Sequence, residues 1–225
     1  MPSLVELTSL RFSYPQSPQP LLQDLSLAMQ ANEAIALIGS NGSGKSTLLK
    51  ILARQLRPAQ GIKRLPEAQK VVMLSQDPHQ DLFLDLTVAE NLVLMGFSFD
   101  GPKAQKAFLD GCHPNLFQRV HQPVQTLSGG EKQAFLLGTS LYHKPSLLLM
   151  DEPTSAMDPK AQDMLMQQLH QKVSRLQSTF VLCSHSLESV QRYTKRLIAL
   201  KKGRIVLDRP SAMPLTASEF QQIYG

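Results

Sequence analysis

Short apolar runs along the chain alternate with longer segments in which apolar residues recur at helical spacing. Largely apolar runs predict strands at residues 33–38, 70–75, 146–150 and 179–183. Helices are predicted at residues 45–55, 159–176 and 217–224. This alternation predicts an α/β fold.

Two regions are predicted to depart from this alternation. Strands at residues 4–14 and 21–29, joined by a Pro/Ser/Gln-rich turn, predict an antiparallel edge sheet, and strands at 197–200 and 204–207 complete the main sheet. A helical insert is predicted at about residues 77–128. Within it, Thr87 and Glu90 have the spacing of a capping box before an apolar run, and Gly101-Pro102 separates this helix from the next.

A glycine-rich segment between the strand at 33–38 and the following helix fits the pattern G-x-x-x-x-G-K-[ST]. Its residues are Gly39, Ser40, Asn41, Gly42, Ser43, Gly44, Lys45, Ser46 and Thr47. Glycines let backbone N–H groups approach a phosphate, and a helix N-terminus favours negative charge. Lys45 is expected to reach the β- and γ-phosphates of ATP, and the Ser46 hydroxyl to bind Mg2+. The alternative is a glycine-rich turn without a ligand.

Two acids, Asp151 and Glu152, follow the strand at residues 146–150. Ligands of open parallel sheets sit at the carboxyl ends of the strands. Asp151 is therefore expected to hold the Mg2+, and Glu152 to polarise the attacking water. Adjacent acids after a strand are more often a solvated turn, but the upstream phosphate loop favours the catalytic interpretation.

A third motif, LSGGEKQ at residues 127–133, has no obvious role within this nucleotide site. Ser128 and Glu131 have capping-box spacing, so Gly129 and Gly130 fall in the first turn of a helix with free N–H groups. A binding element without a local ligand suggests a second copy of the chain.

These motifs, together with SAMD at residues 155–158 and SHS at 184–186, closely resemble the nucleotide-binding domain of ABC ATPases over nearly the whole chain. LSGGE is the discriminating motif. The resemblance implies one domain over residues 1–225, with a P-loop NTPase mixed sheet core, an antiparallel β edge subdomain and a small α-helical subdomain. It also implies that Ser128, Gly129 and Gly130 bind the γ-phosphate of ATP held by a partner subunit, so that two copies sandwich the nucleotide.

Four further positions match the family. Tyr14 resembles the aromatic that stacks on adenine, although it could be an ordinary loop residue. Gln76 matches the glutamine that senses Mg2+ and the attacking water. Asp158 matches the loop that crosses the dimer, and it also suits an N-cap before Pro159. His185 matches the histidine that contacts the γ-phosphate, although a lone histidine at a strand end is usually structural.

The chain carries a net charge of +5, and much of the excess lies in one segment. Seven basic residues between positions 191 and 210 are offset there only by Asp208: Arg192, Lys195, Arg196, Lys201, Lys202, Arg204 and Arg209. A solvated face is the simpler interpretation, and attraction to an anionic membrane surface is the alternative. No recognised module for nucleic acid is present, so no nucleic-acid partner is expected.

Neither a membrane span nor an export signal is apparent in the sequence, which predicts a cytoplasmic protein held peripherally on the inner face of the cell membrane. Cys112 and Cys183 lie outside any metal-binding spacing and are expected to be reduced and without function.

The resulting hypothesis is an ATP-hydrolysing subunit of an ABC membrane transporter, working as a homodimer beneath separate transmembrane permease subunits. Residues 77–85 are a candidate docking segment for these subunits. Import of a small solute is favoured, with a periplasmic or extracellular solute-binding protein acting through the permease. Export of a lipid or drug is the alternative, and a regulatory or scaffolding ATPase without transport is a third possibility.

Overall fold

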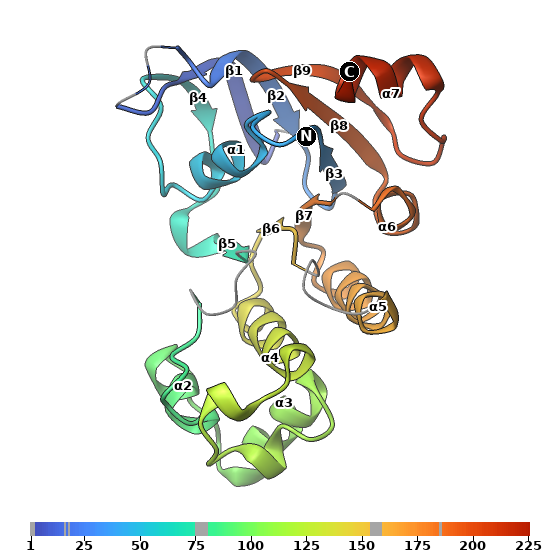
Figure 1. The fold of residues 1–225 in the computed structure, drawn as a ribbon. Helices are drawn as coiled ribbons and strands as arrows, with labels where there is room; N and C mark the ends of the chain where they lie inside the picture. The colour runs from blue at the N-terminus through green and yellow to red at the C-terminus, as the bar shows by residue number, and fades with distance from the viewer. Residues whose placement is uncertain (1–2, 16, 18, 75–80, 154–158, 185) are drawn as a thin grey trace.

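The computed structural model describes the chain except for residues 1–2, 16, 18, 75–80, 154–158 and 185, and except for the side chains of residues 159–161 (Figure 1). Strands and helices alternate over most of its length. The strands are β1 (Val5–Phe12), β2 (Leu22–Met29), β3 (Ala34–Ile38), β4 (Gln60–Arg64), β5 (Val71–Leu74), β6 (Leu147–Asp151), β7 (Thr179–Cys183), β8 (Arg196–Lys201) and β9 (Arg204–Pro210). The α-helices are α1 (Lys45–Leu52), α2 (Val88–Leu94), α3 (Pro102–Cys112), α4 (Gly129–Tyr142), α5 (Pro159–Leu176), α6 (Leu187–Tyr193) and α7 (Ala217–Tyr224).

The main sheet has six strands in the order β5-β6-β7-β3-β8-β9. All neighbours pair in parallel except β8 and β9, which form an antiparallel hairpin. Every residue of β3 and β7 is buried, as is typical of parallel strands covered on both faces. The carboxyl ends of β3, β6 and β7 therefore meet at one edge. The apolar runs predicted these strands to within a few residues.

The second sheet has three antiparallel strands in the order β2-β1-β4. The first two are the predicted edge strands, and their burial alternates along the chain. The third, β4, was not predicted, because it is a mostly exposed polar segment without an apolar run. It is held by backbone pairing with β1, and Gly61 allows a close approach, since a Cβ there would lie 2.4 Å from Leu10 Cα.

Apolar packing joins these parts. One core cluster lies between the three-stranded sheet, α1 and the main sheet, and a second joins the helical region to α5 and the main sheet. Figure 1 shows α2, α3 and α4 at the end of the molecule opposite β1, β2 and α7. The predicted helical insert thus contains α2 and α3, with the short 3-10 turns at Phe117–Arg119 and Val124–Thr126 before α4.

Helix α5 has the predicted bounds. Its apolar residues at helical spacing predict a buried stripe of Ala161, Met164, Leu165, Leu169, Val173 and Leu176, and this prediction is wrong for Met164. Leu165, Leu169 and Val173 are buried, whereas Met164 is 55% exposed. Met166 is buried in its place. Met164 lies one residue before the buried stripe, and one residue is about 100° around a helix, so its side chain turns toward solvent.

The basic segment is more strongly paired than the sequence indicated. Three of its arginines make ion pairs, and three of the four carboxylates lie outside the basic segment. The pairs are Arg196 with Glu33 and Asp208, Arg192 with Asp163, and Arg209 with Glu219. Local neutralisation favours a solvated face over a membrane-binding patch. Across the described residues, no helix combines the length and apolar character that a membrane crossing requires.

The turn at the tip of the β8-β9 hairpin is hydrogen-bonded both to β2 of the three-stranded sheet and to the loop after β3. Lys202 and Gly203 have φ angles of 47° and 75°, both left-handed, as in a two-residue hairpin turn. The Gly203 N–H donates to the Ser43 carbonyl at 3.0 Å, and the Gly203 carbonyl accepts from the Gln23 N–H at 3.0 Å. A Cβ on Gly203 would lie 1.8 Å from the Leu21 carbonyl oxygen, so only glycine fits.

Replacing Gly203 therefore tests this junction. We expect Gly203→Ala to lower the free energy of unfolding by about 3 kcal/mol, because strain and a backbone collision coincide. Gly96→Ala is the matched control: its φ is 77°, but nothing lies within 4 Å of an added Cβ. It should cost only about 1 kcal/mol. Urea denaturation measures both, and equal losses would contradict the assignment.

Candidate nucleotide-binding site

The loop after β3 forms a concave backbone surface at the N-terminus of α1. Gly42 and Gly44 have φ angles of 76° and 106°, which only glycine adopts readily. Gly44 is the N-cap of α1, and no side chain caps this end. The free N–H groups of the first turn are therefore available to an anion. This is the geometry that the glycine pattern predicted.

Lys45 lies within the loop rather than in solvent. Its side chain is nearly buried, with 7% of the residue exposed. The Nζ group donates to the Gly39 carbonyl at 2.8 Å and to the Ser40 carbonyl at 3.2 Å. An ammonium group has three donors, so one remains for a phosphate oxygen. The two hydrogen bonds to backbone carbonyls fix the position of the Lys45 ammonium group.

A cavity of about 280 Å3 opens beside this loop. It joins residues of the glycine-rich segment to a residue more than a hundred positions later. Its lining consists of Leu21, Asn41, Gly42, Gly44, Lys45, Ser46, Thr47 and Glu152. The structure thus brings Glu152 to the predicted phosphate loop. The fold contributes the proximity that neither motif alone could supply.

The two acids lie at the carboxyl end of β6, beside the end of β7. Asp151 is the last residue of β6 and pairs with Cys183, and the Glu152 N–H donates to the Cys183 carbonyl at 3.1 Å. Glu152 has a φ of 52°, a left-handed conformation that costs a non-glycine residue about 1 kcal/mol. Strain of this kind clusters at functional sites, which supports a catalytic role.

The pKa of the Cys183 thiol is shifted by burial and by the charged side chains around it. Burial raises its pKa well above the usual range, the Asp151 and Glu152 carboxylates raise it further, and the Lys45 ammonium opposes them. The thiol also hydrogen-bonds to the Asp151 side chain. Both acids and the loop lysine therefore surround one buried, neutral sulfur. As expected for a structural cysteine, Cys183 is buried and unpaired with any other cysteine.

The donors at this edge suit Mg2+. Ser46 is exposed at the cavity, which also holds the Glu152 carboxylate, and Asp151 lies next to Glu152 at the end of β6. Among the described residues, no group of three or more His, Cys, Asp or Glu side chains could hold a metal unaided. Mg2+ usually keeps several waters and shares substrate phosphates, with only one or two carboxylates from the protein. Ser46 and Asp151 fit that mode.

Tyr14 lies at the mouth of the loop. Its hydroxyl and that of Thr47 are 3.1 Å apart, within hydrogen-bond distance, and its ring meets Phe12 edge-on at 5.0 Å between centroids. The residue is 39% exposed. The tyrosine is therefore positioned by the loop itself and keeps an open surface, as a stacking residue requires; the stacking itself remains a prediction.

The LSGGE segment lies elsewhere. Ser128 caps α4: its hydroxyl accepts from the Glu131 N–H at 3.2 Å, and Glu131 accepts from the Ser128 N–H at 2.8 Å. Ser128 and Gly129 are exposed, and neither they nor Gly130 line the cavity. A Cβ on Gly129 would meet nothing within 4 Å, so this turn presents open backbone to solvent.

Glu131 is fixed by more than the capping box. Burial works against its ionisation, but bonds from Ser128 and the charge of Arg119 outweigh it, and the pKa of Glu131 is lowered. Arg119 Nη1 lies 3.1 Å from Glu131 Oε2. Sequence reasoning missed both Arg119 and Gly203, because each acts through a contact between distant segments. Three predicted site residues, Gln76, Asp158 and His185, lie outside the described residues.

Comparison with known proteins places this geometry in a family. The family model described as "ABC transporter" matches residues 22–155, which include the glycine loop, the LSGGE turn and both acids. The chain belongs to the ABC transporter family. This membership supports the enzyme class predicted from the motifs, an ATP hydrolase.

Individual relatives agree. A putative ABC transporter ATP-binding protein of Bacillus cereus is 35% identical over 90% of this chain, which spans only 40% of that relative's length. The tyrosine transport ATP-binding protein of Clostridioides difficile is 31% identical over 91% of each chain. CbiO1 of Clostridium perfringens, solved as part of the ABC transporter complex CbiONQ, is 21% identical, with a TM-score of 0.80 over 99% of this chain and 94% of that one. The predicted fold class is confirmed.

Replacing Lys45 tests whether the glycine-rich loop binds the phosphates of ATP. We expect Lys45→Ala to weaken Mg-ATP binding about a hundredfold, because a nearly buried cation and its phosphate bond are lost. Lys50→Ala, an exposed position on the same helix, should leave binding unchanged. Titration with a fluorescent ATP analogue measures both, and near-wild-type affinity of Lys45→Ala would refute the assignment.

Proposed function

We propose that this chain is the ATP-binding and ATP-hydrolysing subunit of an ABC membrane transporter, and that two copies close head to tail around two ATP molecules. One observation supports the dimer in which two chains enclose ATP. The cavity holds Lys45 and Glu152, whereas the exposed first turn of α4 at Gly129, whose N–H groups have no partner within the helix, lies outside it. Each chain thus offers two half-sites, and two chains complete them.

Each side chain has a task in this proposal. Lys45 and the loop N–H groups bind the β- and γ-phosphates, Ser46 and Asp151 hold Mg2+, and Glu152 positions the attacking water. Mg2+ neutralises charge that develops on the transferred phosphoryl group. The turn at Ser128 closes over the γ-phosphate of the partner's ATP. ATP binding then favours the closed dimer, and product release reopens it.

Three family positions extend the proposal. Gln76 links the Mg2+ and attacking water to a membrane partner, Asp158 crosses the dimer, and His185 contacts the γ-phosphate. These roles rest on the motif resemblance. The same holds for the treatment of residues 1–225 as one ATPase domain with a helical insert.

A surface beside the helical region supports docking of a transmembrane permease subunit. A hollow of about 220 Å3 is lined by Met73, Leu74, Asp81, Met95, Phe97, Leu136, Thr139, Ser140 and His143. Near it in the chain, Phe83, Val93 and Leu94 are 56%, 72% and 58% exposed. Apolar side chains gathered in one region mark interaction sites. We place the coupling contact here, which includes the described part of residues 77–85.

Import of a small solute is the direction we propose, because the motif context resembles importer ATPases and a relative is named for tyrosine transport. CbiO1 belongs to a multisubunit transporter complex, which supports separate permease chains. The protein would then sit in the cytoplasm on the inner face of the membrane, and a solute-binding protein could act through the permease. Export of a lipid or drug, or control of a partner without transport, are the competing functions.

Mixing two inactive variants tests the composite site. Lys45→Ala removes the phosphate-loop half, and Gly129→Asp places a carboxylate at the open turn of α4, where it should not harm the helix. Each alone is expected to be inactive. An equal mixture should regain roughly a quarter of wild-type ATP turnover, because half the dimers then contain one intact site.

The matched control uses two variants of the same half-site. Lys45→Ala mixed with Glu152→Gln leaves no intact site in any dimer, so turnover should stay absent. Recovery in this control, or none in the test mixture, would rule out a site shared between two chains. Phosphate release under excess Mg-ATP provides the measurement.

Recovery from membranes tests the transport role. We expect the tagged chain to co-purify in detergent with a polytopic membrane protein, and Leu94→Glu to reduce that recovery several-fold by placing a charge in the apolar contact. Met213→Glu, at a 66% exposed position outside the helical region, should not. Recovery only with soluble partners would favour the regulatory alternative, and equal effects of both variants would remove the proposed contact surface.

A further inference from the structure

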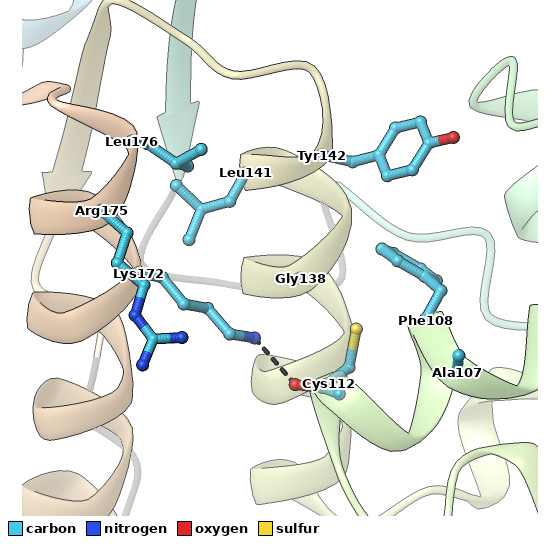
Figure 2. A pocket seen from close by; sticks show the side chains of 10 residues that line it. Ala107, Phe108, Cys112, Gly138, Leu141, Tyr142, Lys172, Arg175 and Leu176 are labelled. Carbon is cyan, nitrogen blue, oxygen red and sulfur yellow. Dashed lines mark hydrogen bonds between the residues drawn. The ribbon is translucent and has the colours of Figure 1, made fainter. Parts of the chain in front are cut away.

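A separate hollow of about 370 Å3 lies between α3, α4 and α5 (Figure 2). None of its lining residues lines the cavity beside the phosphate loop. Its walls are mainly carbon, from Ala107 and Phe108 of α3, Leu141 and Tyr142 of α4, and Leu176 of α5. This volume falls in the range of small-molecule sites, which are also mostly apolar with a few polar groups.

Two glycines shape this hollow. A Cβ on Gly138 would lie 2.1 Å from the Cys112 sulfur, so glycine at this position lets α3 pack directly on α4. A Cβ on Gly111 would meet nothing within 4 Å, so the space above it is open. Glycine inside a helix costs about 1 kcal/mol relative to alanine. Two residues that are unfavourable in helices thus shape the hollow: Gly138 allows the close packing at its floor, and Gly111 leaves the space open.

The charges at the hollow are all of one sign. Lys172 and Arg175 of α5 line it, and no aspartate or glutamate is among the described lining residues. Lys172 Nζ donates to the Gly111 carbonyl at 2.9 Å, the bond dashed in Figure 2, and keeps two further donors. Among the described residues, no hydrogen bond or ion pair engages the Arg175 guanidinium, whose forked donors match a carboxylate.

Cys112 contributes apolar surface rather than reactivity. It is 3% exposed, and burial raises the pKa of its thiol to about 11, although Lys172 opposes this. The sulfur is therefore neutral near pH 7 and is not a nucleophile. Ligands at this hollow are held without a covalent bond.

We propose that this hollow is a binding site for a small anionic amphiphile, with its hydrocarbon chain against Phe108, Leu141 and Leu176 and its carboxylate on Lys172 and Arg175. Apolar walls with cations on one side complement a medium-chain alkyl carboxylate. The occupant is a free molecule in solution. The occupant would contact both α4, which starts at the LSGGE turn, and α5, which packs on the main sheet.

Octanoate and octanamide are matched probes, because they share a chain and differ in charge. By calorimetry with the full chain, octanoate should bind about tenfold more tightly than octanamide, the gain of a charge-assisted bond. Arg175→Gln should reduce this difference several-fold, because only Lys172 then remains for the carboxylate, and it should leave octanamide binding unchanged. Arg57→Gln, an exposed position elsewhere with the same change of charge, should bind both probes as the wild type does.

Filling the hollow provides the second test. Gly111→Leu places a side chain in the open space and improves helix propensity, so it should fold and lose both probes. Ala107→Leu fills the same space from one turn earlier and replaces it if Gly111→Leu does not fold. Binding retained in a folded filled variant, or equal affinity for both probes, would overturn the site. If the protein sediments with phosphatidylglycerol vesicles but does not bind octanoate, the proposal of a free carboxylate ligand is wrong and a lipid surface is favoured.

Discussion

Parallel pairing of β3, β7 and β6 is the constraint on which the rest of this structure depends. Buried apolar side chains hold these strands side by side, and parallel direction brings their carboxyl ends to one edge. The phosphate loop leaves β3 at this edge, and Asp151 ends β6 there. A shift of one residue in the register would move the two acids by about 3.3 Å along the strand relative to the phosphate loop. Packing of the sheet therefore positions the charges that we propose to be catalytic.

The loop and the acids are then held by backbone contacts. Lys45 is fixed by two carbonyls of its own loop, Ser43 is held by the hairpin turn at Gly203, and the strained Glu152 is bonded to Cys183. These contacts preorganise the phosphate half-site. The LSGGE turn is organised by Ser128, Glu131 and Arg119 on a different element. The phosphate loop and the LSGGE turn are thus held by separate sets of contacts on separate elements.

Helix α4 connects several surfaces. Its first turn is the open LSGGE end, its middle residues border the proposed permease contact, and its last turns line the hollow with Lys172 and Arg175. It also packs against α3 and α5, so the LSGGE turn, the proposed permease contact and the hollow share one helix.

The sequence by itself determined the buried strands, most helices, the phosphate loop, both acids and the capping box of Ser128, because periodicity and local backbone chemistry leave a direct trace in the order of residues. Tertiary structure alone decided the strand β4, the exposure of Met164, the pairing of the distant Glu33 with Arg196, and the contacts of Arg119 and Gly203. Each of these depends on segments that meet only after folding. Proximity across the sheet has no local pattern, since it comes from packing, and it placed Glu152 beside a loop more than a hundred residues earlier.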